Sequence, residues 1–295
     1  MPNSAPALNL QQISDALADV VADAAKSVVA VHSTRSRSSG FVWRPGLIMT
    51  ADEALAEEGE IAVTSPGGEA VAATLVGRDP TTDVAVLRAE GVGAPAVALQ
   101  PASPRIGSLA LAVGARNGAA VAAFGAVSSV GPAWRSLRGG EIEQRIELDL
   151  SLRRAGDGSL ALDVCGRPLG MAVFGPRRTV LVIPAATIER VADKLLTRGR
   201  IARGYLGLGL QAAKLAGGEG VGAMVMSVDP AGPGAAAGVR QGDIIVKWNG
   251  EGIRDVRTLL RALGPDSVGQ AAKLSLTRGG EPIEIVLTIG ERPEG

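Results

Sequence analysis

The residues best suited to chemistry lie in a loop between two expected strands, within residues 145–162. Apolar and polar residues alternate over 146–150, which is typical of a strand with one buried face. A tight loop, Ala155-Gly156-Asp157-Gly158-Ser159, follows and leads into a second apolar run. The loop carries a carboxylate at Asp157 and a hydroxyl at Ser159. A hydroxyl becomes an effective nucleophile only when a base lies beside it, so the next question is which base the chain can supply.

The single histidine of the sequence is His32, in an expected strand at residues 28–32. An isolated histidine needs an orienting partner before it acts as a base or a ligand. We therefore expect His32 to be an ordinary strand residue, packed or solvated. The single cysteine, Cys165, cannot close an intrachain disulfide, so cysteine usage leaves the redox compartment open.

The composition argues against several classes of function. Lys and Arg number 30, and so do Asp and Glu, so no net charge favours nucleic acid or an acidic membrane. Aromatic residues make up 2% of the chain, which removes the stacking platforms of single-strand nucleic-acid binders. No run approaches the roughly 18 apolar residues of a membrane span. The first residues do not resemble a secretory signal, so we expect a cytoplasmic protein, or a periplasmic one if a leader was removed.

Hydrophobic spacing predicts helices at the start and middle of the chain and many short strands between them. One amphipathic helix is expected at 9–27 and another at 184–198, with Pro184 near its start and Gly199 just past its end. The expected strands cover residues 28–32, 40–50 with a turn at Pro45-Gly46, 61–64, 70–76, 84–88, 109–113 and 121–130. Many short strands at regular spacing indicate a barrel or a sandwich.

Several segments before Gly199 resemble, in the correct order, the trypsin-like domain of the HtrA family of serine proteases. They are Ser38-Ser39-Gly40-Phe41-Val42, Leu47-Ile48-Met49-Thr50-Ala51, Arg78-Asp79-Pro80-Thr81-Thr82-Asp83-Val84-Ala85-Val86-Leu87, Ala112-Val113-Gly114, Gly125-Ala126-Val127-Ser128 and Val182-Ile183-Pro184. The loop at 155–159 stands where the family carries Gly-Asn-Ser-Gly-Gly, in a register set by Asp149, Gly166 and Gly170. The resemblance implies a mainly β protein, with a chymotrypsin-like double β-barrel at residues 1–200.

Carried over residue by residue, the resemblance keeps one member of the family's catalytic triad. Asp83 stands at the aspartate position, Glu53 at the histidine position and Asp157 at the serine position. A carboxylate cannot replace the hydroxyl in a serine-type acyl transfer, so the resemblance implies an inactive homologue, a pseudoprotease. Ala155 and Ser159 replace glycines of the family's oxyanion turn, and a positive φ at either would be strained.

Three carboxylates brought together repel one another, so the site must raise a pKa, recruit a cation or splay apart. We favour pairing with Arg153 or Arg154, or exposure to solvent, over a Ca²⁺ or Mg²⁺ site, and expect no metal and no cofactor. A carboxylate pair for glycoside hydrolysis ranks lowest. Arg177 and Arg178 replace a glycine-containing strand near the family's specificity pocket, and we expect them to narrow the groove.

Residues 204–291 resemble the PDZ domains appended to HtrA proteases. Gly204-Tyr205-Leu206-Gly207-Leu208-Gly209-Leu210 is similar to the carboxylate-binding loop and the strand after it, and residues 225–230, 235–239 and 241–250 match further signature segments. Asp255 is expected to cap a helix whose Val256, Leu259, Leu260 and Leu263 face inward.

A PDZ domain binds a peptide as an added strand at a sheet edge. The resemblance implies that the backbone N–H groups of residues 206–208 receive a terminal carboxylate, and that leucines and Val256 line a pocket for an apolar last side chain. The expected peptide-binding residues are Tyr205, Leu206, Gly207, Leu208, Leu210, Val256, Leu259 and Leu260. Some of these leucines are expected to belong to the core instead.

The combined expectation is a non-catalytic adaptor or regulator in protein quality control that binds C-terminal or unfolded peptide segments. Whether the chain forms a homo-oligomer stays open. The family often forms trimers through aromatic N-terminal contacts, but the helix at 9–27 has no aromatic residue. Two alternatives are an active endopeptidase that uses Ser151 or Ser159, and divalent-cation binding at the carboxylates. The first lacks a nearby histidine as base.

Overall fold

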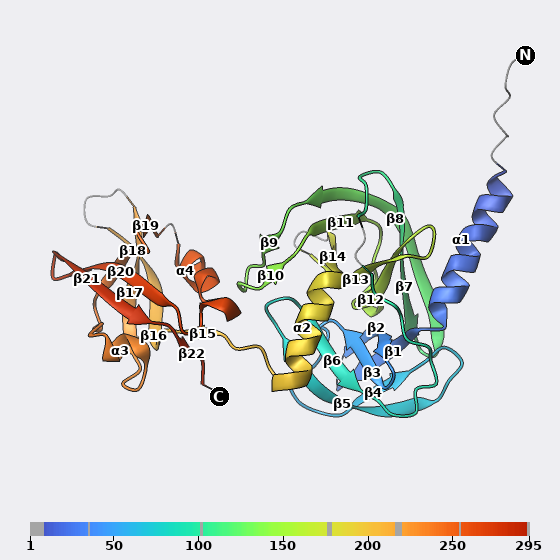
Figure 1. Cartoon of the computed structure of the whole chain (residues 1–295), viewed down its shortest axis with the longest axis horizontal. Helices are drawn as coiled ribbons and strands as arrows, with labels where there is room; N and C mark the ends of the chain where they lie inside the picture. The colour runs from blue at the N-terminus through green and yellow to red at the C-terminus, as the bar shows by residue number, and fades with distance from the viewer. Residues whose placement is uncertain are drawn as a thin grey trace, which may run out of the picture. The chain divides into compact units, whose positions relative to one another are not determined.

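The computed structural model of the chain describes residues 9–34, 36–100, 103–175, 179–215, 220–253 and 255–293. Contacts divide the chain into two compact units, and the colour in Figure 1 follows the residue number through both. The first unit comprises Met1–Trp134 and Ile142–Arg200, and the second comprises Arg135–Glu141 and Ile201–Gly295. The expected first domain, residues 1–200, therefore loses a short segment to the second unit.

Helix α1 (Leu10–Ala25) begins the described chain, one residue later than expected and two residues shorter at its end. The side chain of Asn9 caps it by accepting the N–H of Gln11 at 3.0 Å, which satisfies one of the free donors of the first turn. The helix, blue in Figure 1, packs against β7 (Leu109–Arg116) and β8 (Ala119–Gly131). None of its residues is fully buried, because it covers the barrel from outside.

The first barrel is closed, with strand order β1-β2-β3-β6-β5-β4. Its strands are β1 (Val28–Ser33), β2 (Ser36–Arg44), β3 (Leu47–Thr50), β4 (Ile61–Thr64), β5 (Ala70–Asp79) and β6 (Val84–Arg88). Small aliphatic side chains fill its interior, as the sparse aromatic content predicts; among them are Val29, Val31, Val42, Ile48, Val63, Ala85 and Leu87. The predicted bounds of β4 and β6 are confirmed to the residue.

The second barrel is also closed, with strand order β11-β14-β13-β12-β7-β8. Its strands are β7 (Leu109–Arg116), β8 (Ala119–Gly131), β11 (Arg145–Asp149), β12 (Ser159–Asp163), β13 (Pro168–Phe174) and β14 (Val180–Pro184), and the short strands β9 (Trp134–Arg135) and β10 (Glu141–Ile142) pair with each other. Helix α2 (Ala185–Arg198) packs on strands of both barrels and ends at Gly199, whose φ of 70° only glycine adopts without strain.

The second unit is built around one antiparallel sheet with strand order β16-β17-β18-β20-β21. Its elements are β15 (Gly204–Tyr205), β16 (Leu208–Lys214), β17 (Val221–Val228), α3 (Pro233–Ala236), β18 (Ile244–Trp248), β19 (Glu251–Gly252), α4 (Val256–Ala262), η3 (Pro265–Ser267), β20 (Ala271–Arg278), β21 (Glu281–Thr288) and β22 (Gly290–Glu291). Strand β16 lies at the edge of the sheet, so its outer backbone groups are available for pairing with another chain.

The expected fold class is confirmed: the chain is mainly β, with two six-stranded barrels followed by a PDZ fold. Within the described ranges, no helix has the length and apolar character required to cross a bilayer.

Candidate functional site

A turn between β5 and β6 positions Asp83. The buried carboxylate of Asp79 accepts the N–H of Thr81 at 2.9 Å and the hydroxyls of Thr81 and Thr82 at 2.6 and 2.7 Å. These three bonds compensate for burying Asp79 and close the turn. Asp83 then leaves the turn with φ of 60°, an uncommon conformation for a residue other than glycine, which directs the chain back into β6.

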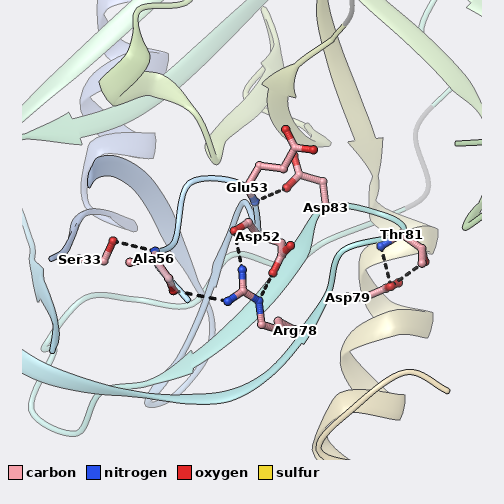
Figure 2. Close-up of polar contacts among 8 residues, drawn as sticks. All are labelled: Ser33, Asp52, Glu53, Ala56, Arg78, Asp79, Thr81 and Asp83. Atoms are coloured by element: carbon pink, nitrogen blue, oxygen red, sulfur yellow. Dashed lines mark hydrogen bonds and ion pairs between the residues drawn. The ribbon is translucent and has the colours of Figure 1, made fainter. Parts of the chain in front are cut away.

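The loop after β3 brings Glu53 to Asp83, as Figure 2 shows. The Asp83 Oδ1 atom accepts the backbone N–H of Glu53 at 2.8 Å, and the exposed Glu53 side chain extends over the same carboxyl group. The neighbouring Asp52 is buried and pairs with the guanidinium of Arg78. Two consecutive acidic residues thus have different roles, since Asp52 anchors the loop to β5 and Glu53 reaches the Asp83 carboxyl.

Asp157 follows the single turn η1 (Arg154–Gly156) between β11 and β12. Its side chain is 8% exposed, and its Oδ1 atom accepts the N–H of Phe174 at 3.2 Å. Ser39 holds the loop from the first barrel: its N–H donates to the Asp157 carbonyl at 2.8 Å and its hydroxyl to the Ala155 carbonyl at 2.7 Å. The loop is therefore fixed between β2 and β13 with the carboxylate inside.

The three carboxyl groups act on one another. Burial raises the pKa of Asp83 to about 8, and repulsion from Asp157, Glu53 and Asp52 adds to the rise. Burial likewise raises the pKa of Asp157 to about 6, with Glu53 adding repulsion. Of the three outcomes considered for clustered carboxylates, a raised pKa occurs here, with burial as its largest cause and repulsion as a smaller one. At neutral pH the Asp83 carboxyl is mostly protonated, which relieves the repulsion without a counter-cation.

The arginines expected to pair with the three carboxylates do not neutralise their charge. Neither Arg153 nor Arg154 forms an ion pair with a described residue, and neither is among the charges that shift the pKa of Asp83 or Asp157. Within the described ranges, no group of three or more His, Cys, Asp or Glu side chains has an arrangement that could hold a metal ion. Arg177 and Arg178, expected to narrow the groove, lie outside the described residues.

Two N–H groups of the turn that would form an oxyanion hole already have backbone acceptors. The N–H of Gly156 donates to the Arg153 carbonyl at 2.7 Å, and that of Asp157 to the Arg154 carbonyl at 3.3 Å. The positive φ of the loop falls on Gly158, at 81°, rather than on Ala155 or Ser159, so the replaced glycines cause no strain. Donors that already have backbone acceptors cannot also stabilise a developing oxyanion.

The two serines proposed as alternative nucleophiles lack a base. The Ser159 hydroxyl is 1% exposed and donates to the Gly156 carbonyl at 2.5 Å. Ser151 is exposed, and its hydroxyl forms no hydrogen bond to a histidine or a carboxylate among the described residues. His32 lies in β1, paired in register with Arg37 and Ala62, and is not among the charges that act on Asp83 or Asp157.

In the second unit, a short loop between β15 and β16 presents backbone donors. The N–H groups of Leu206 and Gly207 donate to no described residue, whereas their carbonyls accept the N–H groups of Gly234 and Asp229 at 2.8 and 2.7 Å. Gly207 has φ of 71°, and the hydroxyl of Tyr205 donates to Asp229 at 2.8 Å. The loop is thus held through its acceptors while its donors stay free for a carboxylate.

The side chains expected to form the peptide pocket divide into three groups, which are buried, exposed and half-buried. Leu206 and Leu259 belong to the core, at 3% and 1% exposed, so Leu259 cannot line an open groove. Leu260 is 52% exposed, so the expectation that it faces inward is wrong. In a short helix, positions 259 and 263 share the buried face, and residue 260 is rotated about 100° away from it. Leu208, Leu210 and Val256 are half-buried beside the core.

Sequence reasoning missed the residues that hold the first site in place. Asp79 and its threonines could have been recognised from the Asp-Pro-Thr-Thr spacing, which is typical of a side-chain-closed turn. The pair of Asp52 with Arg78 and the bonds from Ser39 join segments 26 and 116 residues apart, so no local signal marks them.

Comparisons with known proteins agree with this geometry. A family model described as a trypsin-like peptidase domain matches residues 38–171, and a PDZ domain model matches residues 204–289. A Brucella suis protein named "Probable periplasmic serine endoprotease DegP-like" is 31% identical over 278 residues, which cover 88% of this chain and 53% of the relative. A Bartonella henselae protein of the same name is 30% identical over 286 residues, covering 91% and 56%. The chain spans about half the length of these curated relatives.

Solved structures share the whole architecture. A serine endoprotease from Yersinia pestis is 27% identical with a TM-score of 0.69, and the match covers 94% of this chain and 98% of that one. An HtrA-type protease, AlgWS227A, solved with a tripeptide is 26% identical with a TM-score of 0.67, over 94% and 97% of the two chains. This chain is therefore similar over most of its length to a solved serine endoprotease and to a solved HtrA-type protease.

Proposed function

This chain belongs to the HtrA/DegP family of trypsin-like peptidases that carry a PDZ domain, and from that premise we infer that it is a non-catalytic member that binds peptides. The curated relatives are named as endoproteases, so the absence of catalysis distinguishes this chain from them. The proposed role is that of an adaptor or regulator in protein quality control.

The observation that carries the proposal is the state of Asp157, which stands where the family's nucleophile would stand. Its carboxyl group is buried, accepts the N–H of Phe174 and has a raised pKa of about 6. A carboxylate in this position has no histidine to activate it and no chemistry equivalent to serine acylation. The occupied N–H groups of the η1 turn and the buried hydroxyl of Ser159 support the same conclusion.

Peptide binding is proposed for the edge of β16. The free N–H groups of Leu206 and Gly207 suit a terminal carboxylate, and β16 as an edge strand suits backbone pairing with an extended segment. Leu208, Leu210 and Leu260 supply apolar surface that is half-buried or exposed, as a pocket for an apolar last side chain requires. The likeness to an HtrA-type protease solved with a tripeptide supports this choice.

Two assays on the full chain test the proposal separately. The first incubates unfolded casein with the wild type and with Asp157→Ala, and we expect no cleavage by either. Cleavage by the wild type alone would overturn the non-catalytic reading, because Asp157 would then carry chemistry. Equal cleavage by both would place a nucleophile elsewhere or reveal a contaminant, which an inhibitor profile and repurification distinguish.

The second assay measures fluorescence anisotropy of a labelled decapeptide with an apolar last residue, as the free acid and as the C-terminal amide. We expect saturable binding of the acid and at least about tenfold weaker binding of the amide, since a charge-assisted bond is lost. Equal binding of both forms would contradict carboxylate recognition at residues 206–208.

A further inference from the structure

A hollow of about 650 Å³ lies in the first unit beside the loop that holds Asp157. The hairpin of β1 and β2 forms one wall and the start of η1 forms the other. The lining side chains that could bind a ligand are His32, Ser33, Thr34, Ser36, Arg37 and Arg154. No Asp or Glu is among the described residues that line it, so the hollow is basic in a protein whose overall charge is balanced.

The guanidinium groups of this hollow have spare donors. Arg154 is exposed, and its guanidinium makes no hydrogen bond or ion pair to any described residue. Arg37 donates from Nη1 to the side-chain oxygen of Asn117 at 3.1 Å, which fixes its position and leaves its other donors available. Arginine matches oxyanions through its planar fork, so two such groups in one hollow favour a ligand with several acceptor oxygens.

The hydroxyls of Ser33 and Ser36 belong to the next cross-strand pair, whose side chains point to the opposite face of the hairpin from His32 and Arg37. The Ser33 hydroxyl oxygen accepts the N–H of Ala56 at 3.2 Å, a contact drawn in Figure 2. The proton of this hydroxyl has no acceptor among the described residues. The Ser36 hydroxyl makes no hydrogen bond to a described residue. Thr34 differs, because its hydroxyl donates to the Glu58 carbonyl at 3.2 Å and can only accept from a ligand.

We propose that this hollow binds a phosphate dianion, either as the free ion or as a phosphate monoester. Two guanidinium groups and the His32 ring provide more donors than a carboxylate's two oxygens can accept with good geometry. A phosphate carries about two charges at neutral pH and at least three strong acceptor oxygens, which fit this set. The ligand would bridge the β1–β2 hairpin and the η1 turn, and hence the two barrels.

The site is separate from the features that carry the proposed function. Arg154 and Arg37 do not shift the pKa of Asp83 or Asp157, and the peptide-binding edge at β16 belongs to the other unit. Loss of phosphate binding therefore has no necessary effect on peptide binding, and the two proposals fail independently.

Isothermal titration of the full chain with inorganic phosphate tests the proposal, at ionic strength held constant with chloride. We expect saturable binding of one phosphate, and binding at least about tenfold weaker for Arg154→Gln and for Arg37→Gln. The matched control is Arg88→Gln, because Arg88 is an exposed arginine of the same barrel outside the hollow and should keep wild-type affinity. Unchanged thermal unfolding of each variant without phosphate verifies that it folds.

A second titration with glycerol phosphate separates the two sources of the group. Binding similar to that of inorganic phosphate supports a site open to monoesters, and binding of the free ion alone supports a site closed around it. Three results would overturn the proposal: no saturable binding up to about 20 mM, equal affinity of the wild type and Arg154→Gln, or equal competition by acetate, which would indicate general charge attraction.

Discussion

The Oδ1 atom of Asp83 accepts the backbone N–H of Glu53 at 2.8 Å, so the first barrel joins the residues at two of the family's triad positions by a hydrogen bond between a side chain and the backbone. The bond keeps the carboxyl of Asp83 under the Glu53 side chain, within reach of the charge of Asp157. Burial raises the pKa of Asp83 and outweighs the N–H bond, which favours the ionised form, so the carboxyl binds its proton more tightly than it does in an unfolded chain.

This raised affinity for protons predicts a pH-dependent stability. The pKa of Asp83 is about 8 in the folded chain against 3.8 in the unfolded chain, so the folded state holds the extra proton between these values. Its contribution to the free energy of unfolding is therefore highest at low pH and falls as the pH rises toward 8. Relative to Asp83→Asn, which keeps the Oδ1 acceptor, the wild type should lose a few kcal/mol, by order of magnitude, between pH 5 and pH 8.5.

Urea unfolding of both proteins across this range measures the difference. Asp149→Asn serves as a control, since Asp149 is exposed at the end of β11 and its replacement should leave the wild-type pH profile unchanged. Parallel stability profiles for the wild type and Asp83→Asn would show that Asp83 ionises normally in the folded chain.

The turn that carries Asp83 predicts a graded loss of stability. Asp79→Ala removes the acceptor of three hydrogen bonds donated by Thr81 and Thr82, both of which are buried. We expect a loss of about 2–5 kcal/mol, and a smaller loss for Asp79→Asn, which keeps one acceptor oxygen. Chemical unfolding at pH 6 measures both. Equal losses for the two variants would mean that charge, rather than the acceptor set, holds the turn.

We predict that peptide binding is sensitive to substitution in the loop before β16, where the proposed carboxylate donors lie. An alanine Cβ at Gly207 would lie 2.8 Å from the Gly232 Cα, at a φ of 71° that alanine rarely adopts. Gly207→Ala should displace the loop and weaken binding of the free-acid decapeptide at least about tenfold. Gly252→Ala has open space around it and should bind as the wild type does. Fluorescence anisotropy compares the two, and equal affinities would place the carboxylate elsewhere.

We predict that replacing the two adjacent leucines of α4 has opposite effects, one on stability and the other on peptide affinity. Leu259→Ala removes a core side chain and should cost about 2–5 kcal/mol of unfolding free energy. Leu260→Ala should change stability by about 0.5 kcal/mol or less, because the side chain is 52% exposed, yet weaken binding of the decapeptide. Urea unfolding and anisotropy on the same samples separate stability from affinity. Wild-type peptide affinity in Leu260→Ala would remove Leu260 from the pocket.

Much of the fold could be predicted because its signals are local. Alternating aliphatic residues predict β4 and β6 to the residue, and Pro184 and Gly199 bracket α2 because each has a fixed backbone preference. Strand β5 extends three residues beyond its predicted end at 76, since its last residues pair with β6 and the alternation there gives no warning. The predicted side-chain direction of Leu260 was wrong, because a rotation of about 100° along a short helix separates residue 260 from the buried face.

The sequence by itself predicts that Glu53, Asp83 and Asp157 occupy the family's triad positions, because order and register along the chain suffice for such an assignment, and it stays a prediction. It also determined the mainly β architecture and the loop before β16. Only the tertiary structure decided that Asp52 pairs with Arg78 while Glu53 reaches Asp83, that burial raises the pKa of Asp83 and Asp157, and that Arg154 lines a basic hollow instead of neutralising the carboxylates. Burial and charge pairing depend on contacts between segments that lie far apart in the chain. Tertiary packing brings these segments together, and no local sequence pattern indicates it.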